Sequence, residues 1–439
     1  MKKNYLKMAG GIIIIILACF FLPSFTKRDT IYVHPASCAK PQQPCVFKTL
    51  LGLEPFDTAA VIHNRELVES SLRKGLVWIA AAQLDNGGWG AGTHNRQDVS
   101  DPHAVAADPA TTALVGMALL RNGNTLSKGK YAENLKKAVD FLLEAVENTP
   151  DQNNYITNLK GTQPQTKLGQ NIDAILTMQL FTNVLSKVDK KDCSCIERIE
   201  KALDKCVRKI QQAQDDDGGF KDGGWAPVLQ SALANNALES AKEVGAKVDD
   251  RVLEKSRDYQ KGNFDTKTNS AVTGKAAGVM LYSMSGSARA SAKEARLADS
   301  AIVKAKKEGK LKANAEVNEE NLVVAGISTT QAKKYETAYN VRGAAAKRAQ
   351  DGDVISGFGS NGGEEFLSYL MTGESLIISK DNTWTNWFEK MAGRMVQIQN
   401  NDGSWQGHHC ITSPVFCTAT CLLILSIDKD IDFLVKVKN

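Results

Sequence analysis

The stretch GHHCITSPVFCTATC, residues 407–421, places two histidines and three cysteines within fifteen positions. The whole chain of 439 residues has six histidines and nine cysteines, so both residue types are concentrated here. Imidazole and thiolate groups together bind zinc, and a Cys–His pair can also serve as a nucleophile with its base. A disulfide or a cysteine-rich core helix would explain the same pattern. His408, His409 and Cys410 are therefore the first candidates for catalysis, with these structural alternatives left open.

Three segments that align without gaps indicate which elements must position these side chains. They read KGLVWIAAAQLDNGGW at 74–89, KCVRKIQQAQDDDGGF at 205–220 and KMAGRMVQIQNNDGSW at 390–405. Each has a lysine, a glutamine nine residues later, a glycine four residues further on and an aromatic residue two beyond that. The spacing predicts a helix that ends in a glycine-rich turn, with the aromatic ring folded back onto neighbouring helices. The structural residues of the repeat are Gln83, Trp89, Gln214, Phe220, Gln399 and Trp405.

The rest of the body follows the same plan. Apolar residues recur at intervals of three and four, and strand-like alternation is absent, so the fold class predicted is all-α. Each turn is followed by a helix rich in small residues, and weaker copies of the unit lie between the three clear ones. This gives six helix pairs across residues 65–430, with an Ala- and Lys-rich helical insertion at about 287–338. Residues 431–439 read as a C-terminal tail.

The run KGLVWIAAAQLDNGGW resembles the QW repeat of squalene and oxidosqualene cyclases. The same repeat marks the wider superfamily that includes the protein prenyltransferase β subunits. The resemblance covers residues 65–430 and is strongest in the first, third and last units. It implies an α6/α6 toroid, a barrel of six outer and six inner helices. Because QW repeats are structural, the resemblance does not by itself give the chemistry.

The catalytic motifs of the superfamily are mostly missing from this sequence. It has neither the D-x-D-D acid motif of class II terpene cyclases nor the D-C-T-A-E motif of oxidosqualene cyclases. The resemblance to protein prenyltransferases implies a zinc site made by Asp, Cys and His beside the last two inner helices. Here Glu364 or Glu365 could replace that Asp, and Cys417 falls near the position of the His. The Cys of the family motif has no obvious match.

A closed toroid predicts that side chains far apart in the sequence converge. The first and last helix pairs become neighbours, and the loops that join outer to inner helices all emerge at one end. The first such loop contains His103, and the last contains His408, His409 and Cys410. Imidazole, thiolate and carboxylate groups on one rim suit zinc, or iron where carboxylates dominate. The candidate metal ligands are His103, His408, His409, Cys410, Cys417, Glu364 and Glu365.

Simpler roles are open for the same rim. Asp108 precedes Pro109, a pattern typical of a helix N-cap followed by proline at the first helical position. Cys410 and Cys417 could be joined in a disulfide. The polar segment TQPQTK, at 162–167, could line a cavity mouth or only cap a helix.

The N-terminus predicts export. Lysines at positions 2, 3 and 7 precede an apolar run at 11–25, the arrangement of an export signal. Residues 1–27 are therefore a signal peptide or an uncleaved membrane anchor, and Cys19 is a candidate for lipidation. Residues 28–64 form a segment that contains cysteine and proline. The body is expected on the periplasmic or extracellular face, tethered to a membrane through its N-terminus.

Export would place the cysteines in an oxidising compartment, where disulfides persist. Cys38 and Cys45 flank the loop AKPQQP and make the best candidate for a local bridge. A bridge from Cys193 or Cys195 to Cys206 is a weaker candidate.

Three functions remain open from the sequence: a ligand-binding ring, an enzyme, and a pure scaffold, which would have a filled ring with no open cavity. The net charge of +5 is small for this length, so nucleic acid is not an expected partner. The missing cyclase acids favour a toroid that binds a ligand, either a small apolar molecule such as an isoprenoid or lipid, or a peptide. The alternative is a metal- or thiol-dependent transferase or hydrolase that uses the His/Cys rim. The sequence does not decide whether the protein is an enzyme, and zinc is the cofactor it suggests.

Overall fold

The computed structural model describes residues 65–188, 193–355 and 361–434, all within one compact unit, Pro44–Asn439. The segments 1–27 and 28–64, with Cys19, Cys38 and Cys45, lie outside the described residues. Within the described ranges no helix is both long and apolar enough to cross a bilayer.

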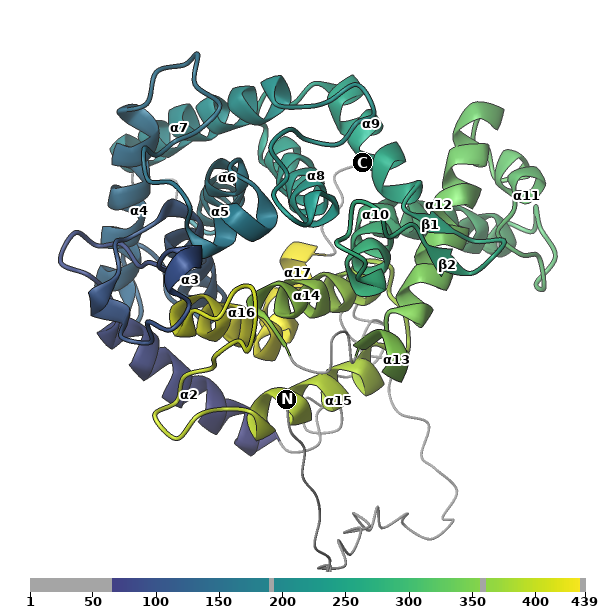
Figure 1. The fold of residues 1–439 in the computed structure, drawn as a ribbon. Coiled ribbons are helices and arrows are strands. Elements are labelled where there is room, and N and C mark those ends of the chain that lie inside the picture. The colour runs from purple at the N-terminus through teal and green to yellow at the C-terminus, as the bar shows by residue number, and fades with distance from the viewer. Residues whose placement is uncertain (1–64, 189–192, 356–360, 435–439) are drawn as a thin grey trace, which may run out of the picture. The chain divides into compact units, whose positions relative to one another are not determined.

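Two rings of helices make up this unit, one inside the other (Figure 1). The inner helices are α3 (Pro109–Arg121), α6 (Ile172–Leu185), α8 (Pro227–Val244), α10 (Met280–Lys307), α14 (Gly363–Ile378) and α16 (Pro414–Leu425). The outer helices are α2 (Arg65–Ala81), α4 (Ala132–Glu147), α7 (Cys193–Gln212), α9 (Asp250–Lys261), α12 (Thr329–Arg348) and α15 (Trp384–Gln397). Each inner helix contacts the next, and α16 contacts both α14 and α3, so the inner ring is closed. The predicted all-α toroid is confirmed.

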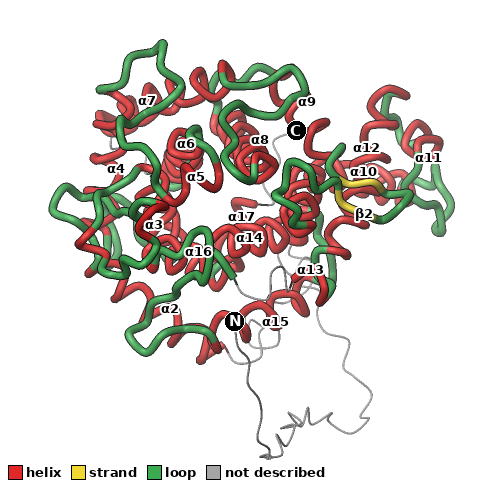
Figure 2. The backbone as a smooth tube through the Cα atoms, viewed as in Figure 1, coloured by secondary structure: helices red, strands yellow, loops and turns green. Residues whose placement is uncertain are grey.

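Short elements fill the connections. They are α5 (Gln163–Leu168), α11 (Glu319–Val324), α13 (Gly352–Ile355), α17 (Ile431–Leu434), and the 3-10 helices η2 (His94–Arg96), η3 (Pro102–Ala104) and η4 (Ile427–Asp430). The strands in the described part are β1 (Phe264–Asp265) and β2 (Ser270–Ala271), which form a small antiparallel hairpin (Figure 2). Part of the predicted tail is thus helical, because α17 covers 431–434.

Burial explains why the two rings differ in composition. Every residue of α3 and of α16 is buried, since each of these inner helices touches two inner neighbours and at least one outer helix. Small residues such as alanine and glycine allow this close approach: a Cβ on Gly116 would lie 2.7 Å from a methyl of Leu180 on α6. Outer helices bury only one face, which is the amphipathic pattern of a helix that covers a core.

The repeated glutamines perform one structural task. In each clear repeat the side-chain amide donates to the carbonyl of the turn glycine and to a carbonyl of another outer helix. Gln83 donates to Asn134 O on α4 at 3.0 Å, and Gln214 donates to Val252 O on α9 at 2.9 Å. Gln399 donates to Ser71 O on α2 at 3.0 Å, which joins the last outer helix to the first.

The repeat aromatics also occupy equivalent places. The indole N–H of Trp89 donates to Ile79 O, and that of Trp405 donates to Met395 O, both at 2.8 Å and both ten residues back. The backbone N–H of the aromatic residue donates to a hydroxyl on the following inner helix, Thr112 for Trp89 at 2.9 Å. These bonds fix each glycine turn to its inner helix and thereby place the rim loops.

The predicted insertion at about 287–338 has a different form in the structure. Residues 280–307 are one continuous inner helix, α10, whose 28 residues extend beyond the ring. The extension, α11 and the start of α12 share a small core of their own, with Ala298, Ile302, Leu322 and Ala332 buried. The fifth outer helix therefore begins at Thr329, inside the range assigned to the insertion. Helical periodicity could not show this, because α10 continues without any break signal.

Candidate functional site

Four side chains from three parts of the ring meet at the rim where the inner helices begin. One oxygen of Glu364, one ring nitrogen of His409 and the sulfur of Cys410 all lie within 4.8 Å of one another. His409 Nδ1 is 3.6 Å from Glu364 Oε1. Lys167 Nζ is 3.3 Å from the same oxygen and donates to Cys410 Sγ at 3.5 Å. We refer to Lys167, Glu364, His409 and Cys410 as the rim cluster.

The first turn of α14 holds the two glutamates. Gly362 is the N-cap, and its N–H donates to Glu365 Oε2 at 2.6 Å, as in a capping box. A Cβ on Gly362 would lie 2.5 Å from Glu364 Oε2 and 2.6 Å from His409 O, so a side chain has no room there. Glu364 is thereby left pointing at His409, while Glu365 is used partly as a cap.

Hydrogen bonds to neighbouring segments hold the loop at 407–413 on both sides. Its His408 N–H donates to Asn361 O at 2.7 Å, and Gly363 N–H donates to Ile411 O at 2.9 Å. Gln163 Oε1 on α5 accepts from the N–H groups of Thr412 and Ser413. Within this frame Cys410 has φ of +55°, a left-handed conformation that a non-glycine residue adopts at some cost. The strain is consistent with a loop shaped to present the thiol.

Lys167 reaches the cluster from α5. This short helix starts at a capping box formed by Thr162 and Gln165. The carbonyl of Lys167 accepts from Ala226 N at 2.9 Å, so its backbone is held by the next loop as well. The side chain is 3% exposed, and its ammonium lies over the ring of Tyr282 at 5.3 Å.

Tyr282, in the first turn of α10, completes the surroundings. Its hydroxyl donates to Glu365 Oε1 at 3.0 Å and lies 3.4 Å from Glu364 Oε1. The sequence analysis named neither Tyr282 nor Lys167 as a site residue. Lys167 does belong to the polar TQPQTK segment, which was the available signal, whereas nothing local distinguishes Tyr282 from a core tyrosine.

The two neighbouring carboxyls differ in charge state. Burial raises the pKa of Glu364, but the hydrogen bond with His409 and the charge of Lys167 outweigh it, so the net shift is downward. Burial and the negative charge of Glu364 raise the pKa of Glu365 to about 7. Burial and Glu364 likewise raise the pKa of Cys410 to about 11. At neutral pH the rim cluster therefore contains a carboxylate and a protonated thiol, and the neighbouring Glu365 is partly protonated.

The remaining candidate residues lie elsewhere. His408 is exposed, on the solvent side of the loop. His103 is exposed as well, with Nε2 at 3.2 Å from Ala81 O and Nδ1 at 3.6 Å from Asp101. Cys417 is buried in α16, and its thiol donates to Ile411 O at 3.6 Å. The structure thus brings together Glu364, His409 and Cys410, with Glu365 alongside, and leaves these three outside.

The disulfides predicted within the described part are wrong. Cys410 and Cys417 are both thiols, and so is Cys206, which excludes its bridge to Cys193 or Cys195. Cys417 and Cys206 are both fully buried. The N-cap expected at Asp108 is present, because Oδ1 accepts from Thr111 N at 2.8 Å.

The donor set of the rim cluster fits a metal that accepts oxygen, nitrogen and sulfur. A carboxylate, an imidazole and a thiol are the zinc ligands of proteins. Glu364 Oε2 is buried and has no hydrogen-bond partner among the described residues, so this carboxylate retains an unused acceptor next to His409 and Cys410. Two of the three ligands are only partly buried, which leaves the cluster accessible from the rim.

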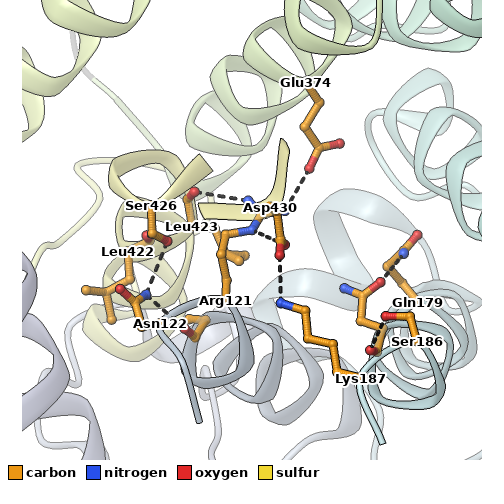
Figure 3. Close-up of polar contacts among 12 residues, drawn as sticks. Arg121, Asn122, Gln179, Ser186, Lys187, Glu374, Leu422, Leu423, Ser426 and Asp430 are labelled. Atoms are coloured by element: carbon orange, nitrogen blue, oxygen red, sulfur yellow. Dashed lines mark hydrogen bonds and ion pairs between the residues drawn. The ribbon is translucent and has the colours of Figure 1, made fainter. Parts of the chain in front are cut away.

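A second feature lies on the axis of the inner ring, toward the ends of its helices. A cavity of about 60 Å³ is lined by leucines and methionines together with Arg121, Arg289 and Glu374. Glu374 accepts from Arg121 and from Arg289, and Arg121 also pairs with Asp430 in η4 (Figure 3). None of the described residues that line this cavity is aromatic.

The closed inner ring and the bond from Gln399 to α2 decide the fold. It is an α/α toroid. No family model and no curated protein matches the sequence of this toroid. Among solved structures it is similar to the apo type II terpene cyclase MstE from Scytonema, at 12% identity and a TM-score of 0.43, over 83% of this chain and 99% of that one.

The solved structure of a glycosidase variant is similar to the toroid at 13% identity and a TM-score of 0.42, over 84% of this chain and 99% of that one. These values do not bear on activity. The fold assignment rests on the helix ring itself and agrees with the resemblance to squalene-cyclase-like QW repeats.

Proposed function

We propose that the toroid is a zinc-dependent enzyme, a hydrolase or transferase, whose metal is held by Glu364, His409 and Cys410. The observation that carries the proposal is the meeting of their three ligand atoms within 4.8 Å. Three protein ligands are typical of catalytic zinc, which keeps a further position open, whereas structural zinc has four. Bound there, zinc would act as a Lewis acid.

The protonation of Cys410 disfavours an unaided thiol nucleophile. A thiol whose pKa is raised to about 11 is protonated at neutral pH and is a poor nucleophile. A divalent cation bound there would have to displace this proton, and coordination would then keep the sulfur as a thiolate. The metal-free form of the enzyme is therefore the less favoured of the two.

Glu365 is suited to hold or release a proton beside this site. Without metal, burial and the charge of Glu364 raise its pKa to about 7, and a cation bound to Glu364 would lower this value by offsetting that charge. Tyr282 fixes Oε1 by donating to it, and Gly362 fixes Oε2. The carboxyl is thus oriented on both oxygens and adjoins Glu364.

Binding of an isoprenoid or lipid within the ring is less well supported. The axial cavity, at about 60 Å³, is far below the roughly 300–1,000 Å³ of typical ligand pockets. Export and tethering to a membrane remain part of the proposal, supported by the basic and apolar N-terminal sequence. They would place the rim cluster outside the cytoplasm.

The test is metal content. Full-length protein is purified without chelator, dialysed against a small excess of zinc and analysed by mass spectrometry of the metal. We expect one zinc per chain, lost in Glu364→Gln, His409→Ala and Cys410→Ala. His408→Ala is the matched control and should retain the metal, since His408 is exposed and lies outside the cluster. No zinc in the parent protein, or equal loss in His408→Ala, would reject the site.

A further inference from the structure

The ammonium of Lys167 contacts the atoms that a metal would need. It lies 3.3 Å from Glu364 Oε1 and donates to Cys410 Sγ at 3.5 Å. Those two residues supply two of the three candidate ligands. The ammonium of Lys167 and a divalent metal would therefore contact the same ligand atoms. Because both are positively charged, they repel each other and cannot both bind there.

The position of Lys167 is built into the fold. Its backbone is fixed by the Thr162 capping box at one side and by the bond from Ala226 N at the other. The flexible part is its four-carbon side chain, and another close neighbour of the ammonium is the ring of Tyr282. Displacement of the ammonium from Glu364 and Cys410 therefore requires rotation of this side chain, because the backbone of α5 is held in place.

We propose that Lys167 is an internal competitor for the rim cluster: the metal binds only by displacing its ammonium from Glu364 and Cys410. This inference rests on the proposed zinc site and adds the residue that sets its affinity. The displaced ammonium would remain within reach of the metal, where it offers a contact to an anionic group of a substrate. The substrate class expected is accordingly a molecule that carries a carboxylate or phosphate close to the reacting bond.

Zinc affinity is the first readout. Full-length parent protein and Lys167→Met are titrated with zinc against a chromophoric chelator. Methionine preserves much of the length of the side chain and removes the charge, so the variant should bind zinc at least tenfold more tightly. Lys167→Arg retains the charge and should not gain affinity. If Lys167→Met fails to fold, Lys167→Gln provides the same comparison.

Chemical labelling of the parent protein is the second readout and needs no variant. With an acylating reagent followed by peptide mass spectrometry, Lys167 should be protected without zinc and should become at least several-fold more reactive with zinc. Lys209 is the control: it is also buried but donates to Pro150 O, far from the cluster, and should remain protected throughout.

The outcomes separate the two ideas. Absence of zinc binding in the parent protein rejects the metal site and the competition together. Zinc binding that depends on Glu364, His409 and Cys410, with unchanged affinity in Lys167→Met and unchanged labelling of Lys167, rejects the competition alone. Tighter binding in Lys167→Met with zinc-dependent labelling supports both.

Discussion

Arg121, at the end of inner helix α3, donates through Nε to Asp430 in η4 at 2.7 Å, although 309 residues separate the two (Figure 3). Both side chains are almost fully buried, and Lys187 pairs with the second oxygen of Asp430 at 2.7 Å. These ion pairs of Asp430 therefore hold the end of the described chain against the inner ring.

Asp430→Asn should lower the free energy of unfolding by about 1–3 kcal/mol, because Arg121 loses one of its two buried carboxylate partners and keeps Glu374. Urea denaturation followed by circular dichroism measures the loss. Asp432→Asn, two residues on and exposed, is the matched control and should change stability by less than about 0.5 kcal/mol. Equal stability of the two variants would show that the buried pair contributes nothing net.

Glu239 should make the protein sensitive to acid. Burial raises its pKa, but Lys293, Arg257 and Arg289 outweigh burial and lower it to about 2. Since an unfolded glutamate has a pKa of about 4.3, the stabilisation is complete above that pH and is lost as pH falls toward 2. Glu239→Gln should remove this part of the pH dependence, measured as unfolding free energy from pH 2 to 7. Glu320→Gln, on an exposed residue of α11, should leave the curve as it is.

Asp108 and Asp173 should have the opposite effect on the pH dependence of stability: they should make the protein less stable as pH rises. Burial raises the pKa of Asp108 to about 6, and burial together with the charge of Asp108 raises that of Asp173 to about 7. A carboxyl with a raised folded-state pKa stabilises the fold below its unfolded pKa, about 3.9, and this contribution disappears as pH rises through 6 to 7. Asp173→Asn should therefore gain stability relative to the parent as pH increases from 4 to 8. A constant difference between the two proteins over that range would contradict the assignment.

Gln399 joins the two ends of the ring, because it bonds both to the turn at Gly403 and to Ser71 on α2. Gln399→Leu should cost about 1–3 kcal/mol, since it leaves buried carbonyls without a donor. Gln83→Leu breaks the equivalent bonds between α2 and α4 and should cost a similar amount. Hydrogen exchange distinguishes them: faster exchange should appear in α2 and α15 for the first variant, and in α2 and α4 for the second.

The sequence predicts the ring well because the repeat chemistry is local. Gln, Gly and aromatic residues lie at fixed offsets, and each meets partners that the helix–turn–helix plan places nearby. The convergence of the first and last rim loops also follows, once the ring is assumed to close. The insertion is misplaced since α10 and its extension share one uninterrupted helical pattern.

The sequence predicts only some of the residues that form the site. His408 and His409 are adjacent in sequence, yet one is exposed and the other pairs with Glu364. Which of them points inward depends on an irregular loop with Cys410 in a left-handed conformation, and no periodicity describes such a loop. Lys167 lies on α5 and Tyr282 on α10, far from the glutamates in sequence. Only the three-dimensional structure shows that both side chains face the glutamates.

Lys429, beside Asp430, pairs with Glu69 in the second turn of α2 at 3.3 Å, so the two ends of the described toroid lie against each other. A chain arranged in this way has no structural first or last unit. A permutant would link the end of the described chain to its beginning and open new termini at the exposed Lys247 between α8 and α9. Such a circular permutant is expected to keep the rim cluster intact, because the order of its units in the chain would change while their neighbours would not.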